Sequence, residues 1–258
     1  SSSGGTNKMK VARFTPISQD YGNLDDCSLP DYEPFGVTEM LDDWSDATRL
    51  LYKYSRPYPR PWNILTARGC PFQCSFCTHR QGKGKYRERS IPNIIAELKD
   101  TYEKYHWNIL IILDELFAVN KERVREFCQA VIDGKKTYGW DFDFMFQTHA
   151  SASLGLEEYR LLKEAGCFFF SYGIESASPL VLKSMDKRIE LSQIENAIKL
   201  AREAKIGFGG NLIFGDPAET VETIKESLKW WLKWGQTTEI FLSFVVPYPG
   251  SKIFDDLA

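Results

Sequence analysis

The sequence lacks any hydrophobic segment long enough to cross a membrane. Its longest largely apolar runs, at 109–113 and 241–246, are far shorter than the roughly 20 residues that a membrane-spanning helix needs. The opening segment, SSSGGTNK, has no apolar stretch of the kind that a secretory signal peptide requires. We therefore expect a cytoplasmic protein without a membrane span.

The sequence also lacks a large excess of either charge. It contains 32 Lys and Arg against 35 Asp and Glu, which gives a net charge of −3. Proteins that bind nucleic acid generally present a broad basic surface to the phosphates, so we expect no general nucleic-acid binding. A hydrophobic content of 43% and a charged content of 26% are typical of a globular chain and exclude a disordered one.

Histidine is scarce, with three residues, whereas the six cysteines are unevenly distributed. Cys70, Cys74 and Cys77 share one short segment with the spacing C-x3-C-x2-C. In a chain without a signal peptide, such a trio indicates a metal site rather than a set of disulfides. Three thiolates from one loop can bind three irons of a cubane cluster and leave the fourth iron open. A structural zinc site with His79 as the fourth ligand is the alternative.

A regular alternation of apolar and helical segments begins at Trp62. The predicted strands lie at 62–66, 109–114, 142–148, 168–174, 208–214 and 240–246, and the predicted helices at 91–105, 121–136, 156–165, 191–204 and 221–234. Continuous apolar strands are typical of a parallel sheet that is covered on both faces. The pattern predicts an α/β fold, either an open sheet or a barrel, with ligands at the carboxyl ends of the strands.

The segment before this alternation, residues 1–61, is predicted to be an irregular N-terminal extension. It contains one strand-like run at 11–16, several proline-punctuated stretches and a short predicted helix near 38–43. The regular core then occupies residues 62–258.

The last complete predicted helix, at 221–234, is amphipathic. Its apolar stripe, which we expect to face the core, consists of Val221, Ile224, Leu228 and Leu232. The tryptophans at 230, 231 and 234 serve either helix packing or contact with another domain.

Ionisable residues lie at the predicted carboxyl ends of three strands. Glu175 ends an otherwise apolar strand, so it either serves the site or forms a structural ion pair. Asp114 and Glu115 either contact a ligand or act as acids ahead of a helix that Asn120 caps. His149 either lines the site or is a core histidine with satisfied hydrogen bonds.

The segment RGCPFQCSFC, directly after the first strand, resembles the C-x3-C-x-aromatic-C signature of the radical S-adenosylmethionine (radical SAM) superfamily. ILDELFAVN, AGCFFFSYGIES, GDPAET and PYPGS are similar to segments of the branch that usually carries an upstream cobalamin-binding domain. This resemblance implies a partial (β/α)6 TIM-type barrel over 62–258. It also implies that 1–61 contains a remnant of the connector from an upstream domain.

The resemblance implies roles for individual residues. Cys70, Cys74 and Cys77 would ligate a 4Fe–4S cluster whose open iron binds the amine and carboxylate of SAM. The other expected SAM contacts are Phe76, Ile213, Gly215, Val246 and Pro247 beside the adenine, Asp114 and Glu115 near the ammonium, and Glu175 and Ser176 at the ribose or amino-acid moiety. Gln147 and His149 stand where relatives often carry an arginine, so we expect them at the SAM carboxylate or the substrate.

The activity that this resemblance implies is reductive cleavage of SAM to methionine and a 5′-deoxyadenosyl radical. In the full-length enzyme it would serve cobalamin-linked methylation or rearrangement. The alternatives are cobalamin-independent hydrogen abstraction and a non-catalytic Fe–S or zinc-binding scaffold. The sequence has no D-x-H-x-x-G motif for histidine-on cobalamin binding and no second cysteine trio.

The expected partners are a substrate that the sequence does not identify and a reductant such as flavodoxin or ferredoxin. The segment 68–89 contains six Lys and Arg but one acid, Glu88. It is either a solvated loop or a docking surface for an acidic electron donor, which such a charge would steer toward the cluster.

Overall fold

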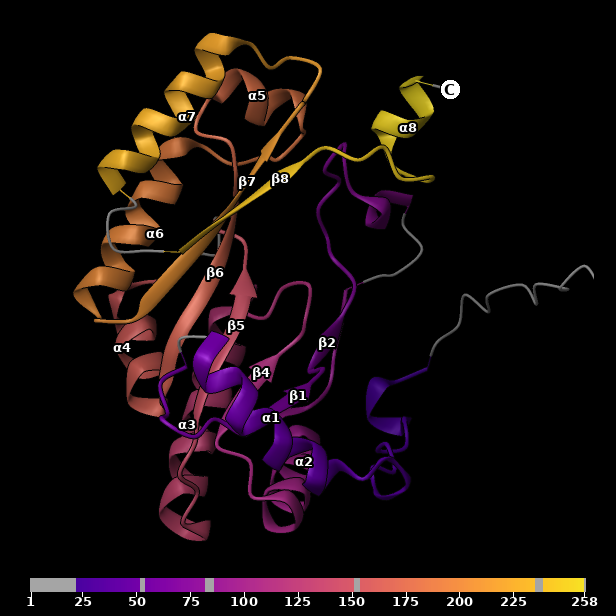
Figure 1. Ribbon diagram of the computed structural model, residues 1–258, viewed down its shortest axis with the longest axis vertical. Helices are drawn as coiled ribbons and strands as arrows, with labels where there is room; N and C mark the ends of the chain where they lie inside the picture. The colour runs from indigo at the N-terminus through magenta and orange to yellow at the C-terminus, as the bar shows by residue number, and fades with distance from the viewer. Residues whose placement is uncertain (1–21, 52–53, 82–85, 151–153, 235–238, 258) are drawn as a thin grey trace, which may run out of the picture.

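The computed structural model describes residues 22–51, 54–81, 86–150, 154–234 and 239–257. Its main feature is a six-stranded sheet in which the strands follow one another in chain order (Figure 1). All neighbouring pairs are parallel. The strands are β1 Pro61–Ile64, β4 Ile109–Ile112, β5 Asp143–Thr148, β6 Cys167–Glu175, β7 Gly207–Phe214 and β8 Glu239–Phe244.

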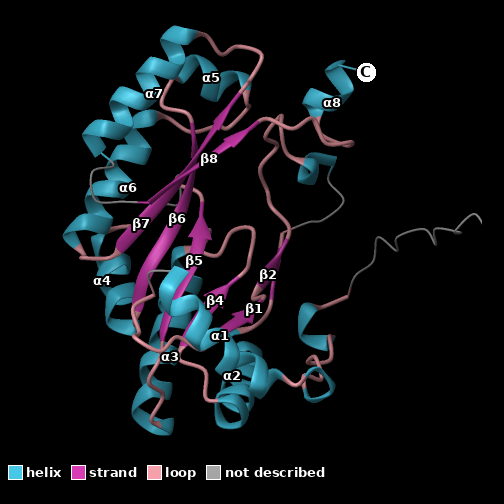
Figure 2. Cartoon of the chain, in the orientation of Figure 1, coloured by secondary structure: helices cyan, strands magenta, loops and turns pink. Residues whose placement is uncertain are grey.

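Helices connect these strands and cover the outer face of the sheet (Figure 2). They are α2 Ile91–Tyr105, α3 Lys121–Tyr138, α4 Leu156–Ala165, α6 Leu191–Glu203 and α7 Val221–Trp234, with a short α5 at Pro179–Ser184. Crossovers between parallel strands are right-handed, so a sheet built in chain order carries its connecting helices on one face. Contacts of α3 with α2 and α4, and of α4 with α6, show this single layer. The α/β prediction is therefore confirmed as a partial barrel.

Local sequence signals account for the ends of the helices. Ser90 and Asn120 are N-caps whose side chains accept hydrogen bonds from backbone N–H groups in the first turns of α2 and α3. Gly166 ends α4 with a φ of 106°, a left-handed conformation that favours glycine. Phe146 of β5 is buried in the core, with ring centroids 4.9 Å from Phe117 and 5.3 Å from Phe170.

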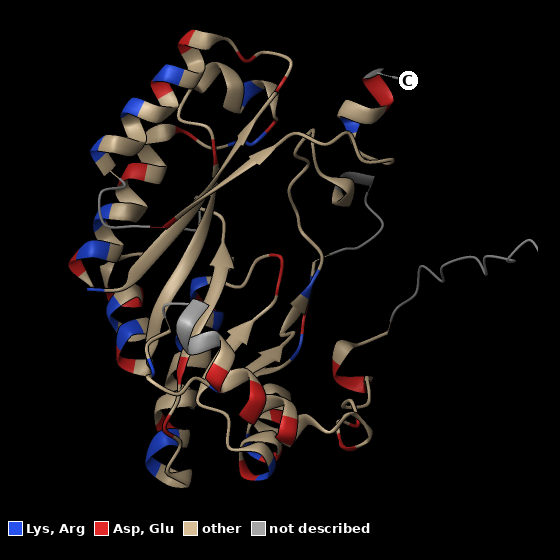
Figure 3. Cartoon of the chain, in the orientation of Figure 1, with Lys and Arg blue, Asp and Glu red and all other residues tan. Residues whose placement is uncertain are grey.

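Basic and acidic residues are interspersed along the outer helices (Figure 3). Acidic residues are prominent on α1, which spans Val37–Leu51. In the part of the chain that the structure describes, no helix is long and apolar enough to cross a membrane.

The prediction of a parallel sheet covered on both faces is wrong for the last strand. β8 lies at the edge of the sheet, and its exposed side chains include Phe241, Leu242 and Phe244. The helix that follows β8, α8 at Lys252–Leu257, lies beyond the carboxyl end of the strand rather than over its face (Figure 1). Ile240 packs against the core, whereas Phe241, Leu242 and Phe244 are exposed to solvent.

The prediction that the apolar stripe of α7 faces the core is also wrong. Val221, Leu228 and Leu232 are exposed, whereas Thr223, Ser227, Trp230 and Trp234 are buried. The buried face of α7 makes a polar contact with the turn that follows β6. Ser227 Oγ accepts a hydrogen bond from the backbone N–H of Ala177 at 3.0 Å and lies 3.2 Å from Ser176 Oγ. A small hydroxyl-bearing side chain lets the helix approach this turn closely.

The N-terminal extension is more helical than its sequence pattern indicates. α1 covers Val37–Leu51 instead of 38–43, and its Val37 and Leu41 join the main core. The strand-like run at 11–16 lies outside the described residues. A short antiparallel pair, β2 Ala67–Arg68 with β3 Arg87–Glu88, closes the base of the loop that carries the cysteine trio. Strands of two residues give no periodic signal, so this pair is not apparent from the sequence.

Candidate active site

The cysteine trio lines a cavity at the carboxyl ends of the central strands. The cavity has a volume of about 220 Å³. The predicted site residues that line it are Cys70, Cys74, Cys77, Phe76, Glu115, Gln147, His149 and Glu175. The loop that carries the cysteine trio is called the cluster loop below. Side chains from this loop, from β5 and from β6 therefore meet in one place, as expected for a parallel sheet whose ligands bind beyond the strand ends.

A buried ion pair forms one wall of this cavity. Lys187 Nζ lies 2.7 Å from Glu175 Oε1, and each of the two side chains is 7% exposed. Glu175 adopts a left-handed φ of 64°, which is uncommon for a residue with a side chain. Within the described residues, the other carboxylate oxygen, Glu175 Oε2, is buried without a hydrogen-bond partner. An unsatisfied buried carboxylate oxygen is costly, so its presence indicates a place for a polar ligand.

His149 connects the cluster loop with this ion pair. Its ring stacks on Phe72 with 4.1 Å between ring centroids and 17° between ring planes. Burial, with a further contribution from the nearby Lys187 ammonium, lowers the pKa of His149 to about 3. The imidazole is therefore neutral at physiological pH and does not add a second positive charge to the cavity.

The cysteine thiols are in a partly buried environment. Burial raises the pKa of Cys74 to about 11 and also raises the pKa of Cys70. These thiols lose their protons when a metal binds, because only thiolates are good ligands. No group of three Cys, His, Asp or Glu side chains within the described ranges is arranged around a single metal ion.

The donor set in the cavity fits an iron–sulfur cluster together with a polar organic ligand. Three thiols are available for three irons of a cubane. Beside them lie Glu175 Oε2 and Thr148 Oγ1, both buried and without a hydrogen-bond partner among the described residues. These atoms would be available to a polar ligand bound beside the cluster.

Several cavity residues could not be assigned from the sequence. They are Phe72, Leu116, Thr148, Ser171, Gly173, Lys187 and Asn211. His79, the predicted alternative zinc ligand, also lines the cavity. Ser171 and Asn211 are polar residues within otherwise apolar strands, which is a signal that sequence reading could have used. Lys187 lies in the charged segment between α5 and α6, where the sequence gives no reason to expect burial.

Other predicted site residues lie outside the cavity lining. Asp114 is fully buried, and Asp114 Oδ1 accepts hydrogen bonds from the backbone N–H groups of Thr66 at 2.6 Å and Ala67 at 3.0 Å. It thereby fixes the chain between β1 and the cluster loop. The Ser176 hydroxyl is buried against Ser227, and it accepts a hydrogen bond from the N–H of Ser178 at 3.1 Å.

The residues predicted to frame an adenine lie at the ends of the last two strands. Ile213 and Gly215 are on and after β7, and Val246 and Pro247 follow β8. The two strand ends are adjacent, since the N–H of Val245 donates to the carbonyl of Phe214 at 2.7 Å. None of the four lines the 220 Å³ cavity, so their contact with SAM stays a prediction.

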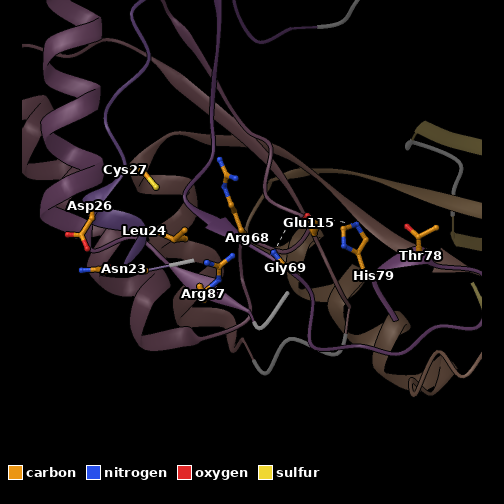
Figure 4. Close-up of a pocket in the computed structure, with 11 residues that line it drawn as sticks. Asn23, Leu24, Asp26, Cys27, Arg68, Gly69, Thr78, His79, Arg87 and Glu115 are labelled. Carbon is orange, nitrogen blue, oxygen red and sulfur yellow. Dashed lines mark hydrogen bonds and ion pairs between the residues drawn. The ribbon is translucent and has the colours of Figure 1, made fainter. Parts of the chain in front are cut away.

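A second cavity, of about 520 Å³, borders the cluster loop (Figure 4). Arg68 and Arg87 come from the β2–β3 pair, and Asn23 and Cys27 come from the N-terminal extension. Glu115 and His79 line both cavities, which therefore adjoin. The described part of the basic segment thus lies next to the cysteine trio, and its use by an electron donor stays a prediction.

Known proteins with similar sequences include enzymes whose names describe them as methyltransferases and cyclases. One is an uncharacterized methyltransferase of Pyrococcus horikoshii, 30% identical over 193 residues, which are 74% of this chain and 41% of that protein. Another is the anaerobic magnesium-protoporphyrin IX monomethyl ester cyclase of Rubrivivax gelatinosus, 28% identical over 86% of this chain and 39% of that protein. The chain spans about two fifths of the length of these relatives.

Solved structures agree with the fold. The radical SAM methyltransferase TsrM of Kitasatospora setae, with cobalamin and a 4Fe–4S cluster bound, superposes with a TM-score of 0.66 at 19% identity. The match covers 79% of this chain and 40% of TsrM. The family model of the radical SAM superfamily matches residues 64–230, which include the cysteine trio and the Glu175–Lys187 pair. The chain therefore belongs to the radical SAM superfamily, whose members use a 4Fe–4S cluster and SAM and require a reductant.

Proposed function

We propose that this chain is the catalytic core of a cobalamin-dependent radical SAM enzyme that methylates or rearranges a substrate carbon in the full-length protein. The observation that carries this proposal is the single cavity in which the three thiols meet the buried Glu175–Lys187 pair. A 4Fe–4S cluster and SAM, when bound, supply reductive cleavage to methionine and a 5′-deoxyadenosyl radical.

The residues of the cavity have separable tasks in this proposal. Cys70, Cys74 and Cys77 would hold the cluster through their thiolates. The Lys187 ammonium would bind the carboxylate of SAM, while Glu175 Oε2 would accept hydrogen bonds from its amine or ribose hydroxyls. These polar contacts orient the cofactor, and the protein excludes water from it.

The aromatic rings of the cluster loop limit access of water to the cavity. Phe72 and Phe76 both line it, and Phe72 is held in place by its stacking on His149. A reactive radical requires a site that excludes side reactions with solvent. The two phenylalanines of the loop sequence CPFQCSFC would therefore help to protect the radical from solvent.

The dependence on cobalamin rests on the comparisons. The Pyrococcus horikoshii relative is described as a methyltransferase, and the TsrM structure contains cobalamin. The alternative is cobalamin-independent hydrogen abstraction, because the match to the radical SAM superfamily does not by itself imply cobalamin. Anaerobic purification of the full-length protein distinguishes them, since retention of cobalamin supports the first and a cobalamin-free active enzyme supports the second.

The SAM-cleavage activity is tested on anaerobically reconstituted protein reduced with dithionite or a flavodoxin system. We expect methionine and 5′-deoxyadenosine to form, measured by liquid chromatography with mass spectrometry. Cys74→Ala should abolish both products, and Cys27→Ala should preserve them. A protein that holds an intact cluster but neither binds nor cleaves SAM would support the non-catalytic scaffold instead.

A further inference from the structure

The cluster loop is held at its centre by two segments that are distant in the sequence. Ser75 lies between Cys74 and Phe76, and its backbone N–H donates to the carbonyl of Met185 at 2.8 Å. The carbonyl of Ser75 accepts the backbone N–H of Ile253 at 3.1 Å. Ser75, Met185 and Ile253 are all buried, so water does not compete with these two hydrogen bonds.

Ile253 is suited to this contact by its position in the first turn of α8. The first N–H groups of a helix have no partner within the helix, so the N–H of Ile253 is available to the loop. The turn before the helix is itself fixed, because the buried Ser251 hydroxyl donates to the carbonyl of Tyr248 at 2.7 Å. Figure 1 shows α8 beside the loop that follows β2.

Met185 connects the loop with the ion pair of the cavity. It follows α5 directly, and its N–H donates to the carbonyl of Val181 at 2.9 Å. Lys187, two residues further on, binds Glu175 at 2.7 Å. The backbone of Ser75 is therefore fixed relative to both α8 and the polar wall of the cavity.

We propose that Ile253 is a positioning residue for the cluster: its backbone N–H, opposite the carbonyl of Met185, fixes Ser75 and thereby the spacing of the Cys74 and Cys77 thiols. The inference rests on the proposed cluster site at the cysteine trio. Loss of this tether loosens the loop, which speeds release of iron and changes solvent access to the cluster. Solvent exposure and hydrogen bonding set the reduction potential of such clusters, so the potential shifts as well.

The test removes the backbone donor without removing the helix. Proline is tolerated in the first turn of a helix, so Ile253→Pro deletes the N–H that reaches Ser75. Ile253→Ala removes most of the same side chain but keeps the N–H, and Lys252→Pro places the ring one residue earlier and leaves the N–H of Ile253 intact. These two variants are the matched controls for side-chain loss and for the proline ring.

Three measurements follow the effect in the full chain. We expect Ile253→Pro to release iron to a chelator about fivefold faster than Ile253→Ala, as the loss of one hydrogen bond implies. We also expect a shifted midpoint potential in an EPR-monitored redox titration, with the parent potential retained in both controls. In cluster-free protein, the amides of 70–77 should exchange with deuterium about fivefold faster in Ile253→Pro than in Ile253→Ala.

The possible results separate this inference from the proposed function. Equal iron release, equal potential and equal hydrogen exchange in Ile253→Pro and Ile253→Ala would overturn the tether. If the parent protein binds no iron, the proposed cluster site fails, and the exchange measurement on cluster-free protein still decides whether Ile253 holds the loop.

Discussion

Breaking the buried ion pair between Glu175 and Lys187 should strongly destabilise the protein. Both side chains are 7% exposed and 2.7 Å apart. Replacing Lys187 with methionine leaves the Glu175 carboxylate buried without its counter-ion, which typically costs about 3–5 kcal/mol. Since domains of this kind are stable by about 5–15 kcal/mol, Lys187→Met should remove a large share of the free energy of unfolding.

A double-mutant cycle isolates the pair. Lys187→Met combined with Glu175→Gln leaves no unpaired charge, so the double variant should be more stable than Lys187→Met alone. We expect a coupling energy of about 2 kcal/mol or more, which is in the range measured for residues in direct contact. Urea unfolding of cluster-free, reduced protein, followed by tryptophan fluorescence, measures each corner without interference from bound SAM.

The matched control is the exposed pair of Arg160 and Glu203. Their side chains are 65% and 55% exposed at an N–O distance of 3.3 Å. Arg160→Met should therefore change the free energy of unfolding by less than about 1 kcal/mol. If Lys187→Met costs no more than Arg160→Met, the carboxylate of Glu175 reaches water and the argument from burial is refuted.

Three further predictions concern the same site. Cys70→Ala, Cys74→Ala or Cys77→Ala should each abolish binding of about four irons per chain, whereas Cys27→Ala should not; stoichiometric zinc without iron in anaerobically purified protein would contradict this. The His149 pKa of about 3 lies below its ordinary value of 6.5, so the unfolded state takes up a proton that the folded state does not, and stability falls as the pH drops below 6.5. Between pH 7.5 and 5.5 this linkage amounts to about 1.4 kcal/mol; it should be absent in His149→Gln, and equal pH slopes in urea unfolding would refute the assignment. Gly173→Ala places a Cβ 2.6 Å from Glu175 Oε1 and 2.8 Å from Lys187 Nζ, so it should displace the ion pair, cost about 1–3 kcal/mol and weaken SAM binding measured by calorimetry; unchanged binding would contradict it.

The regular part of the fold follows from the sequence to a large extent. Each of the six predicted strands overlaps an observed strand. A short continuous apolar run between turn residues is typical of a buried strand of a parallel sheet. The position of the cysteine trio at the end of the first strand could also be predicted, since three thiols in one loop need no tertiary information to be adjacent. The predicted helix at 156–165 is likewise confirmed, since α4 spans Leu156–Ala165.

The orientation of α7 could not be predicted in this way. Its apolar stripe of Val221, Leu228 and Leu232 is exposed. Hydrogen bonding of Ser227 to the turn after β6 determines which face packs on the sheet, and that partner is 50 residues away in the sequence. An amphipathic pattern reports a contrast between two faces, and it does not identify the neighbour of either face.

The sequence by itself determined the six strands with their connecting helices, the three adjacent thiols and, through the resemblance, membership of the radical SAM superfamily. Each of these features depends on residues that are close together in the sequence. Only the tertiary structure decided that Lys187 pairs with Glu175, that Asp114 holds the chain after β1 instead of lining the cavity, and that Ile253 reaches the loop at Ser75. Each of these contacts joins residues 12 to 178 positions apart, and their geometry is set by how strands and helices pack rather than by any local pattern.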